Sequence, residues 1–288
     1  MWIADQWKDY EVIDTSDGEK LERWGKYTLV RPDPQVIWNT PKTDRRWRSH
    51  DARYARSNTG GGKWSDNRLP ERWQVHYGPL TFNVKPMNFK HTGVFPEQAA
   101  NWDFIRQKVA SAASRRPVRV LNLFAYSGGA TLAAAAGGAE VFHVDASKGM
   151  VQWAKENAVA SGLADRPIHW MVDDCAKFIQ REIRRGRKYD GIIMDPPSYG
   201  RGPSGEIWKM ETSFYPFLLE TAKLLTDDPL FVIINSYTTG LAPSAVSYAA
   251  DVVFGADHGG KTAVGELGLP VKSSGIMLPC GSTGRWTP

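Results

Sequence analysis

The stretch Val118-Arg-Val-Leu-Asn-Leu-Phe-Ala-Tyr-Ser-Gly-Gly-Ala-Thr131 decides the fold. Its apolar run, which ends at Phe124, predicts a short buried strand, and the alanine-rich segment after it predicts a helix. Gly128 and Gly129 between the two allow a sharp turn and a close approach to a bound molecule. A helix N-terminus that faces the end of a strand is a common ligand site, although an ordinary strand–helix turn gives the same pattern.

Length and composition exclude several classes of protein. The 288 residues suit one large domain or one domain with a smaller companion, and a hydrophobic content of 42% supports a core. No apolar run is long enough for a membrane span, and the charged N-terminus predicts no export signal. Two cysteines fit a cytoplasmic location, and no metal-ligand spacing occurs. The net charge of +5 gives mild support for a polyanionic partner, and a homo-oligomer is left open.

Residues 1–85 differ in composition from the rest of the chain and predict a small β-rich domain. Seven of the twelve tryptophans fall here, and prolines and glycines punctuate short apolar runs. The runs that predict strands are Tyr27–Val30, Val36–Trp38, Trp73–Tyr77 and Leu80–Val84.

The segment 42–56 interleaves basic residues with the aromatic residues Trp47 and Tyr54. Single-stranded nucleic acid binds such mixtures, because cations contact phosphates and rings stack on bases. Arg45, Arg46 and Trp47 are therefore candidate substrate contacts. The alternative is a solvated loop whose aromatic side chains cover the edge of the core.

From residue 118 onward, strand and helix patterns alternate, which predicts a parallel sheet with ligands at the carboxyl ends of the strands. Each of four successive predicted strands ends in a turn or a side chain that can bind a ligand at that edge. In chain order these are the glycine turn, Asp145, the pair Asp173 and Asp174, and Asp195. The predicted helices are 98–113, 129–136, 147–160, 176–185 and 213–225, and a further strand is predicted at Leu230–Asn235.

The series of aspartates predicts an adenosine-type ligand. Asp145 lies about 20 residues beyond the first turn, where a carboxylate accepts both hydroxyls of a ribose. Asp173 and Asp174 are placed to accept an amino hydrogen of adenine. Tyr126 is bulky where a dinucleotide fold needs a close phosphate approach, so a sulfonium donor is favoured over a nicotinamide.

The run Asp195-Pro-Pro-Ser-Tyr199 predicts a rigid turn with acceptors at its rim. The two prolines remove N–H donors and leave carbonyls. Such a rim suits a planar substrate with N–H groups. We expect the amine to donate to Asp195 and to the carbonyl of Pro196, and Tyr199 to stack on the ring.

These motifs together resemble class I S-adenosylmethionine-dependent methyltransferases, and most closely the branch that methylates bases of large-subunit ribosomal RNA. The matching residues are Leu121–Gly128, Val144–Ser147 with Trp153, Glu156 and Asn157, then Asp174–Cys175, Asp195–Tyr199 and the lead-in His91–Gln98. The resemblance implies a Rossmann-like, seven-stranded, mostly parallel methyltransferase sheet with helices on both faces in residues 86–288, behind the N-terminal β-rich domain. Its last strand would be antiparallel, and a hairpin would pair 263–269 with 275–278.

The resemblance also implies S-adenosylmethionine as cofactor and assigns roles to residues. The expected cofactor-binding residues are Phe95, Gln98, Phe124, Ala125, Tyr126, Ser127, Gly128, Asp145, Ala146, Ser147, Asp173, Asp174, Cys175 and Asp195. The expected catalytic residues are Asp195, Pro196, Pro197 and Tyr199. Further candidate phosphate contacts are Lys209 and the arginines Arg184, Arg185, Arg187 and Arg201, although solvated surface charges give the same pattern.

One departure from the family bears on mechanism. The cytosine-5 enzymes place a nucleophilic cysteine after the fourth or fifth strand, and here those places read Pro197-Ser198 and 235–240, without cysteine. We therefore expect direct methyl transfer to a nitrogen, with guanine in ribosomal RNA as the substrate base. The alternatives are a small-molecule or protein N-methyltransferase, a non-catalytic cofactor-binding protein that binds RNA, and a dinucleotide oxidoreductase.

Overall fold

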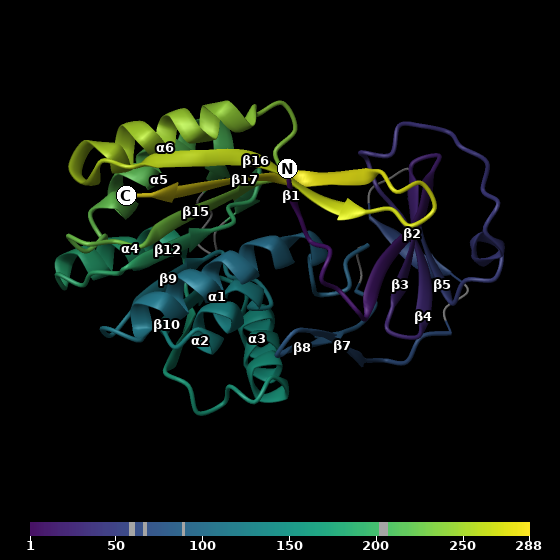
Figure 1. Cartoon of the computed structure of the whole chain (residues 1–288), viewed down its shortest axis with the longest axis horizontal. Coiled ribbons are helices and arrows are strands. Elements are labelled where there is room, and N and C mark those ends of the chain that lie inside the picture. Colours follow the sequence, from purple (N-terminus) through teal and green to yellow (C-terminus); the bar gives the residue numbers. More distant parts are fainter. Residues whose placement is uncertain (58–60, 66–67, 88–89, 202–206) are drawn as a thin grey trace. The chain divides into compact units, whose positions relative to one another are not determined.

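The computed structural model describes residues 1–57, 61–65, 68–87, 90–201 and 207–288 (Figure 1). The chain divides into two compact units. The first unit contains residues 1–100 and 267–280, and the second contains residues 101–266 and 281–288. The chain therefore leaves the second unit near its C-terminus and then returns to it.

The second unit is built on a mostly parallel sheet. Its strands are β9 (Arg119–Leu123), β10 (Glu140–Asp145), β11 (Ile168–Val172), β12 (Gly191–Met194), β15 (Phe231–Ser236), β16 (Lys261–Pro270) and β17 (Met277–Thr287). The parallel part has the order β15-β12-β9-β10-β11, and β17 lies antiparallel to β15 with β16 beyond it. The predicted α/β fold, including the antiparallel strand, is confirmed.

Helices cover both faces of this sheet (Figure 1). They are α1 (Ala99–Ala113), α2 (Gly129–Ala136), α3 (Lys148–Ala160), α4 (Cys175–Arg184), α5 (Met210–Ala222) and α6 (Pro243–His258). Apolar side chains of α4, α5 and α6 form one cluster with Leu123, Met194 and Ile234 of the sheet, while α1, α2 and α3 lie on the opposite face. Within the described residues, no helix combines the length and the apolar character that crossing a membrane requires.

The loop after β12 carries a short antiparallel hairpin, β13 (Tyr199–Arg201) and β14 (Ile207–Lys209), before α5 begins. The helix predicted at 213–225 is α5, which begins and ends three residues earlier. It ends early because the chain must turn inward after it. Leu225 is buried and forms an isolated parallel bridge with Tyr189, two residues before β12.

The first unit carries a five-stranded sheet in the order β2-β3-β4-β5-β6 and a separate hairpin of β7 with β8. The strands are β2 (Tyr10–Ser16), β3 (Glu19–Trp24), β4 (Tyr27–Pro32), β5 (Ala52–Arg56), β6 (Gly62–Ser65), β7 (Trp73–Tyr77) and β8 (Leu80–Val84). The strand predicted at Val36–Trp38 is wrong. That segment is a loop, whose carbonyls at Val36 and Trp38 accept the N–H groups of Gly18 and Asp17.

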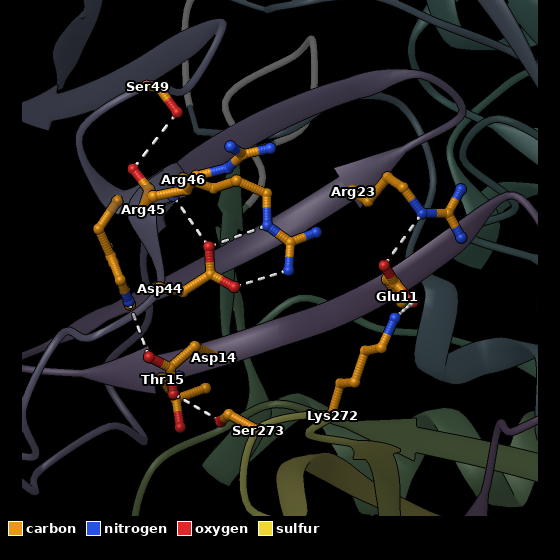
Figure 2. A network of polar contacts seen from close by, with 11 residues as sticks. Glu11, Asp14, Thr15, Arg23, Asp44, Arg45, Arg46, Ser49, Lys272 and Ser273 are labelled. Atoms are coloured by element: carbon orange, nitrogen blue, oxygen red, sulfur yellow. Dashed lines mark hydrogen bonds and ion pairs between the residues drawn. The ribbon is translucent and has the colours of Figure 1, made fainter.

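The C-terminal hairpin contributes residues 267–280 to the first unit, which also extends to residue 100, past the boundary predicted between residues 85 and 86. β1 (Trp2–Ile3) pairs in parallel with the end of β16. The hydroxyl of Ser273 donates to Asp14 at 2.6 Å, and Lys272 lies 3.4 Å from Glu11 (Figure 2). These contacts tie residues 267–280 to strands at the beginning of the sequence.

Candidate active site

The turn between β9 and α2 has an unusual backbone. Phe124 has φ of +55° and Tyr126 has φ of +49°, in the left-handed region that residues other than glycine rarely enter. Two hydrogen bonds fix this shape: the N–H of Ala125 donates to the Val144 carbonyl at 3.1 Å, and the N–H of Phe124 donates to Sγ of Cys175 at 3.3 Å. Strained backbone concentrates at functional sites, so the turn is a candidate for ligand binding.

Packing accounts for both glycines of the turn. A Cβ atom at Gly128 would lie 2.9 Å from Cβ of Ala154 in α3, and one at Gly129 would lie 2.6 Å from the ring of Trp102 in α1. The neighbours that approach these glycines closely are therefore side chains of α1 and α3. The contact of Gly128 with a bound molecule stays a prediction.

Asp145 ends β10 and holds the turn with its carboxylate. One oxygen accepts the N–H of Tyr126 and the other accepts the N–H of Ser147, both at 2.8 Å. Burial raises the pKa of Asp145, and the two N–H donors oppose that increase. Each carboxylate oxygen has a second acceptor site. The predicted contact with two ribose hydroxyls therefore fits this geometry.

The two aspartates after β11 have different surroundings. Asp174 caps α4, where one of its oxygens accepts the N–H of Lys177 at 2.9 Å. Asp173 forms an ion pair with Arg181, and its N–H donates to the Asp145 carbonyl at 3.0 Å. This last bond keeps the ends of β10 and β11 aligned. The cap uses one oxygen of Asp174 and leaves the other to accept an amino hydrogen.

Cys175 is a buried structural thiol. Its Sγ accepts the N–H of Phe124 and lies 3.9 Å from the carbonyl of Val144. Burial raises the pKa of the Cys175 thiol well above its usual range. Burial likewise raises the pKa of Cys280, which belongs to the first unit. Because the thiolate is the reactive form, neither side chain has the character of a nucleophile.

The segment Asp195–Tyr199 continues from β12. The N–H of Asp195 donates to the Leu123 carbonyl at 3.4 Å, so the segment stays aligned with β9 through this residue. Pro196 is buried, whereas Pro197 is exposed and Tyr199 is 51% exposed. The Pro196 carbonyl has no hydrogen-bond donor among the described residues. The contacts of Asp195, the Pro196 carbonyl and the Tyr199 ring with a substrate stay predictions.

Trp208 is a residue that the sequence reasoning missed. Its Nε1 donates to the Pro197 carbonyl at 2.6 Å, so that carbonyl is occupied within the protein. Its ring lies 5.4 Å from the ring of Phe124 and 5.3 Å from that of Phe217. Trp208 therefore joins the rim after β12 to the turn after β9. The only sequence signal was an aromatic residue five residues before the helix predicted at 213–225, and spacing alone does not indicate which residues it contacts.

The register of the sheet brings these features to one edge. Leu123 in β9 pairs with both Val144 in β10 and Met194 in β12. The next residue of each strand therefore emerges at the same level. The strained turn, Asp145 and Asp195 consequently share the carboxyl edge of the sheet, where parallel α/β folds bind ligands.

The remaining predicted cofactor residues have less distinctive surroundings. Ser127 is buried and its carbonyl accepts Nδ2 of Asn157 at 2.9 Å, whereas Ala146 is exposed. Phe95 and Gln98 belong to the first unit, at the short helix η2 (Pro96–Gln98) before α1. Their roles stay predictions. Lys209 is the exposed N-cap residue of α5, and the side chain of Arg201 lies outside the described part of the chain.

The basic segment of the first unit forms an internal polar network (Figure 2). In the short helix η1 (Arg45–Trp47), Arg46 pairs with Asp44 at 2.7 Å, while Arg45 is exposed. Nε1 of Trp47 donates to Asp14 at 2.8 Å, and the side chain is only 7% exposed. The prediction that Trp47 offers its ring to a base is therefore wrong, because the ring belongs to the core of this unit.

A groove of about 820 Å³ lies between α4 and α5, and Asp174 is one of its lining residues. One wall is a basic stripe of α4, formed by Lys177, Arg181 and Arg184 at intervals of four and three residues. Residues at this spacing share one face of a helix. The opposite wall includes Trp208, so the groove adjoins the rim after β12.

Comparison with known proteins places the chain in a family. A family model described as S-adenosylmethionine-dependent methyltransferase matches residues 18–221. The crystal structure of the SAM-dependent methyltransferase from Agrobacterium tumefaciens is 38% identical with a TM-score of 0.92, over 99% of this chain and 93% of that chain. SMU.776 complexed with SAH is 19% identical with a TM-score of 0.69, over 98% of this chain and 76% of that chain, and supports the fold alone.

Sequence relatives include proteins named ribosomal RNA large subunit methyltransferase K/L. The one from Shewanella frigidimarina is 30% identical over 173 residues, which cover 59% of this chain and 23% of the relative. The one from Chromohalobacter salexigens is 31% identical over 172 residues, which cover 58% of this chain and 21% of the relative. The match thus spans less than a quarter of either relative.

Proposed function

We propose that this chain, which belongs to the family of S-adenosylmethionine-dependent methyltransferases, methylates a base nitrogen of ribosomal RNA. Specifically, we propose a nitrogen of guanine. Its cofactor is S-adenosylmethionine. One observation carries the proposal: the strand ends at Asp145 and Asp195 share one edge of the sheet, beside the exposed ring of Tyr199.

The residues at this edge fit the adenosine part of the cofactor. The Asp145 carboxylate keeps an acceptor site on each oxygen for the ribose hydroxyls, after binding the N–H groups of Tyr126 and Ser147. Asp174 keeps one oxygen for the amino group of adenine, because its helix cap uses only the other. Both carboxylates follow adjacent paired strands, β10 and β11.

When bound, the cofactor supplies a methyl group on a positively charged sulfur. The Asp195 carboxylate and the Pro196 carbonyl accept the N–H groups of the base and orient the nitrogen toward the methyl. The same two acceptors stabilise the positive charge that develops on that nitrogen. Its proton leaves after transfer, so no strong base is needed. The exposed ring of Tyr199 offers a face on which an unpaired base stacks.

The state of the cysteines supports direct transfer. Cys175 lies at the carboxyl edge, but its sulfur is buried and bonded to the N–H of Phe124. Cys280 forms a hydrogen bond with the Leu278 carbonyl at 3.3 Å. A covalent cytosine-5 mechanism needs an accessible thiolate next to the base. Neither cysteine meets that requirement.

Two observations favour RNA as the substrate. The relatives from Shewanella frigidimarina and Chromohalobacter salexigens are named for ribosomal RNA. The groove between α4 and α5 combines the basic stripe of Lys177, Arg181 and Arg184 with the aromatic residue Trp208, and it adjoins the rim that would hold the base. Cations beside aromatic rings are the usual combination for an unpaired strand.

Transfer of labelled methyl to large-subunit ribosomal RNA, isolated from a strain that lacks the gene, tests the proposal. We expect label on a single guanine, located by nuclease digestion and mass spectrometry. Asp195→Ala should abolish transfer while S-adenosylhomocysteine still binds, because Asp195 acts on the acceptor nitrogen. The absence of label from ribosomal RNA with active, cofactor-bound enzyme would reject the RNA substrate.

A further inference from the structure

Asn235 sits at the carboxyl end of β15, next to the residue proposed to hold the methylated nitrogen. Met194 in β12 pairs with Ile234 in β15, and Asp195 and Asn235 are the next residues of these parallel strands. Neighbouring strands lie about 4.8 Å apart, and aligned residues project to the same face. Asn235 and Asp195 therefore lie side by side on the face covered by α1.

A chain of hydrogen bonds fixes which way the amide of Asn235 points. Nε of Arg285 donates to Oδ1 of Asn101 at 2.9 Å, and a guanidinium has only donors. The other amide atom of Asn101 is thus Nδ2, which donates to Oδ1 of Asn235 at 3.0 Å and to the hydroxyl of Thr283 at 3.2 Å. The remaining atom of the Asn235 amide is therefore its NH2 group.

This NH2 group has no acceptor among the described residues, although the Asn235 side chain is only 3% exposed. The Nδ2 atom is not one of the fully buried side-chain atoms that lack a partner, so it still reaches solvent space, where an acceptor atom of a ligand can approach it. The contact with Asn101 does not supply an acceptor, because it uses only the oxygen of Asn235. An aspartate at this position would serve Asn101 equally well.

We propose that the NH2 group of Asn235 donates to an acceptor atom of the substrate base, adjacent to the nitrogen held by Asp195. This inference rests on the proposed function and deepens it. Asp195 accepts and Asn235 donates, so together they recognise a base edge that presents an N–H group beside a ring nitrogen or carbonyl. Guanine presents such an edge. Asn235 is thus a substrate-binding contact of the acceptor site, which helps to orient the base.

Two substitutions and a matched control test this contact. Asn235→Asp keeps the acceptor for Asn101 and removes the donor, and Asn235→Ala removes both without adding a charge. Thr283→Val removes the other acceptor of Asn101 and leaves the Asn235 donor in place.

We expect kcat/KM for RNA to fall about tenfold to a hundredfold in both Asn235 variants and less than threefold in Thr283→Val. The affinity for S-adenosylhomocysteine should stay within about twofold, which also reports the fold. Equal effects of all three variants, or an equal loss of cofactor affinity, would overturn the inference.

A binding experiment separates this inference from the RNA substrate. The side-chain NH2 signals of Asn235 are those missing from the nitrogen–proton spectrum of Asn235→Asp. We expect them to move when guanosine monophosphate is added to the S-adenosylhomocysteine complex, and to stay in place when S-adenosylhomocysteine alone is added. Movement with guanosine monophosphate, but no methylation of ribosomal RNA, would reject only the RNA substrate. Movement with the cofactor product alone, or no movement with the nucleotide, would overturn the role of Asn235.

Discussion

The carboxylate of Asp145 accepts N–H groups from two turns at once. Tyr126 belongs to the turn after β9, and Ser147 belongs to the turn that starts α3. The side chain is thus fixed before any ligand arrives, and each of its oxygens keeps a second acceptor site. A preorganised acceptor of this kind costs little ordering when a ribose binds.

Asp145→Asn should weaken cofactor binding. The amide places an NH2 group against one of the two N–H donors and supplies one acceptor fewer. Hydrogen bonds to charged groups contribute about 1.5–3 kcal/mol, so we expect the affinity for S-adenosylhomocysteine to fall about tenfold to a hundredfold. Isothermal titration calorimetry measures this. Asp165→Asn, at an exposed position, is the matched control and should bind normally. Unchanged affinity in Asp145→Asn would reject the ribose contact.

Removal of both cysteines should leave methyl transfer largely intact. Cys175→Ser combined with Cys280→Ala eliminates every thiol and keeps an acceptor for the N–H of Phe124, and the proposed chemistry uses no thiol. We expect kcat to stay within about threefold of the wild-type value, with some loss of stability because both residues pack inside the protein. The assay is methyl transfer to RNA. A folded double variant that binds S-adenosylhomocysteine but has lost all transfer would point to covalent catalysis.

At the level of residues, the sequence indicated position better than orientation. The aspartates could be placed because each follows an apolar run, and parallel strands bring such positions to one edge. The exposure of the Trp47 ring was predicted wrongly, because a mixture of basic and aromatic residues does not indicate which ring packs in the core. The ring packs with Ile13, Leu21 and Val30 and donates to Asp14 of β2, a strand that the sequence did not predict.

A buried chain of polar side chains joins three elements beneath the turn. Nδ2 of Asn122 in β9 donates to the Thr131 hydroxyl in α2 at 2.9 Å, and that hydroxyl lies 2.9 Å from Nδ1 of His143 in β10. Burial lowers the pKa of His143 to about 3. The imidazole is therefore neutral throughout the neutral pH range. The chain holds the start of α2 against both strands.

The depressed pKa of His143 makes stability depend on pH. The unfolded chain binds a proton at His143 below about pH 6.5, whereas the folded chain does so only near pH 3. The contribution of neutral His143 is thus complete above pH 6.5 and is lost as the pH falls toward 3. Between pH 7 and pH 5 it should remove about 2 kcal/mol from the free energy of unfolding.

Urea denaturation at the two pH values measures this effect. His143→Asn keeps a polar side chain next to Thr131 and has no titration in this range. The wild type should therefore lose about 2 kcal/mol more than His143→Asn between pH 7 and pH 5. An equal loss in both proteins would show that His143 is not the source of the pH dependence.

At the level of elements, periodicity located most helices because caps mark their starts. Ser147 and Asp174 accept N–H groups of α3 and α4 with their side chains, as short polar residues at these positions do. α5 was misplaced by three residues because Lys209 makes no side-chain cap bond. Its start follows instead from the Met210 N–H, which donates to the Ser198 carbonyl.

Over the whole molecule, the net charge of +5 favours RNA but does not locate it. The groove beside α4 is the proposed RNA site, and Arg184 is an exposed cation on its wall. Arg184→Gln should weaken RNA binding about threefold to tenfold and reduce the slope of log affinity against log salt by about one. Fluorescence anisotropy over a salt series measures both. Arg115→Gln, an exposed position after α1 and before β9, removes the same charge away from the groove and should change neither slope nor affinity. Equal behaviour of the two variants would reject the groove as an RNA site.

The division of the chain could be predicted only in part. The change in composition near residue 85 separates a β-rich beginning from an alternating α/β part, and both are present. The return of residues 267–280 to the first unit could not be predicted. It depends on pairing between β16 and β1, strands from opposite ends of the sequence, and no local pattern encodes such a partner.

A crystal structure of the protein with S-adenosylhomocysteine tests the central claim most directly. That claim is that the turn, Asp145 and Asp174 bind one cofactor, and that the reacting end of this cofactor lies next to Asp195. We predict the ribose hydroxyls on Asp145, the adenine amino group on Asp174 and the sulfur nearest to Asp195. A nucleoside bound away from this edge, with Asp145 and Asp174 making no contact to it, would contradict the account.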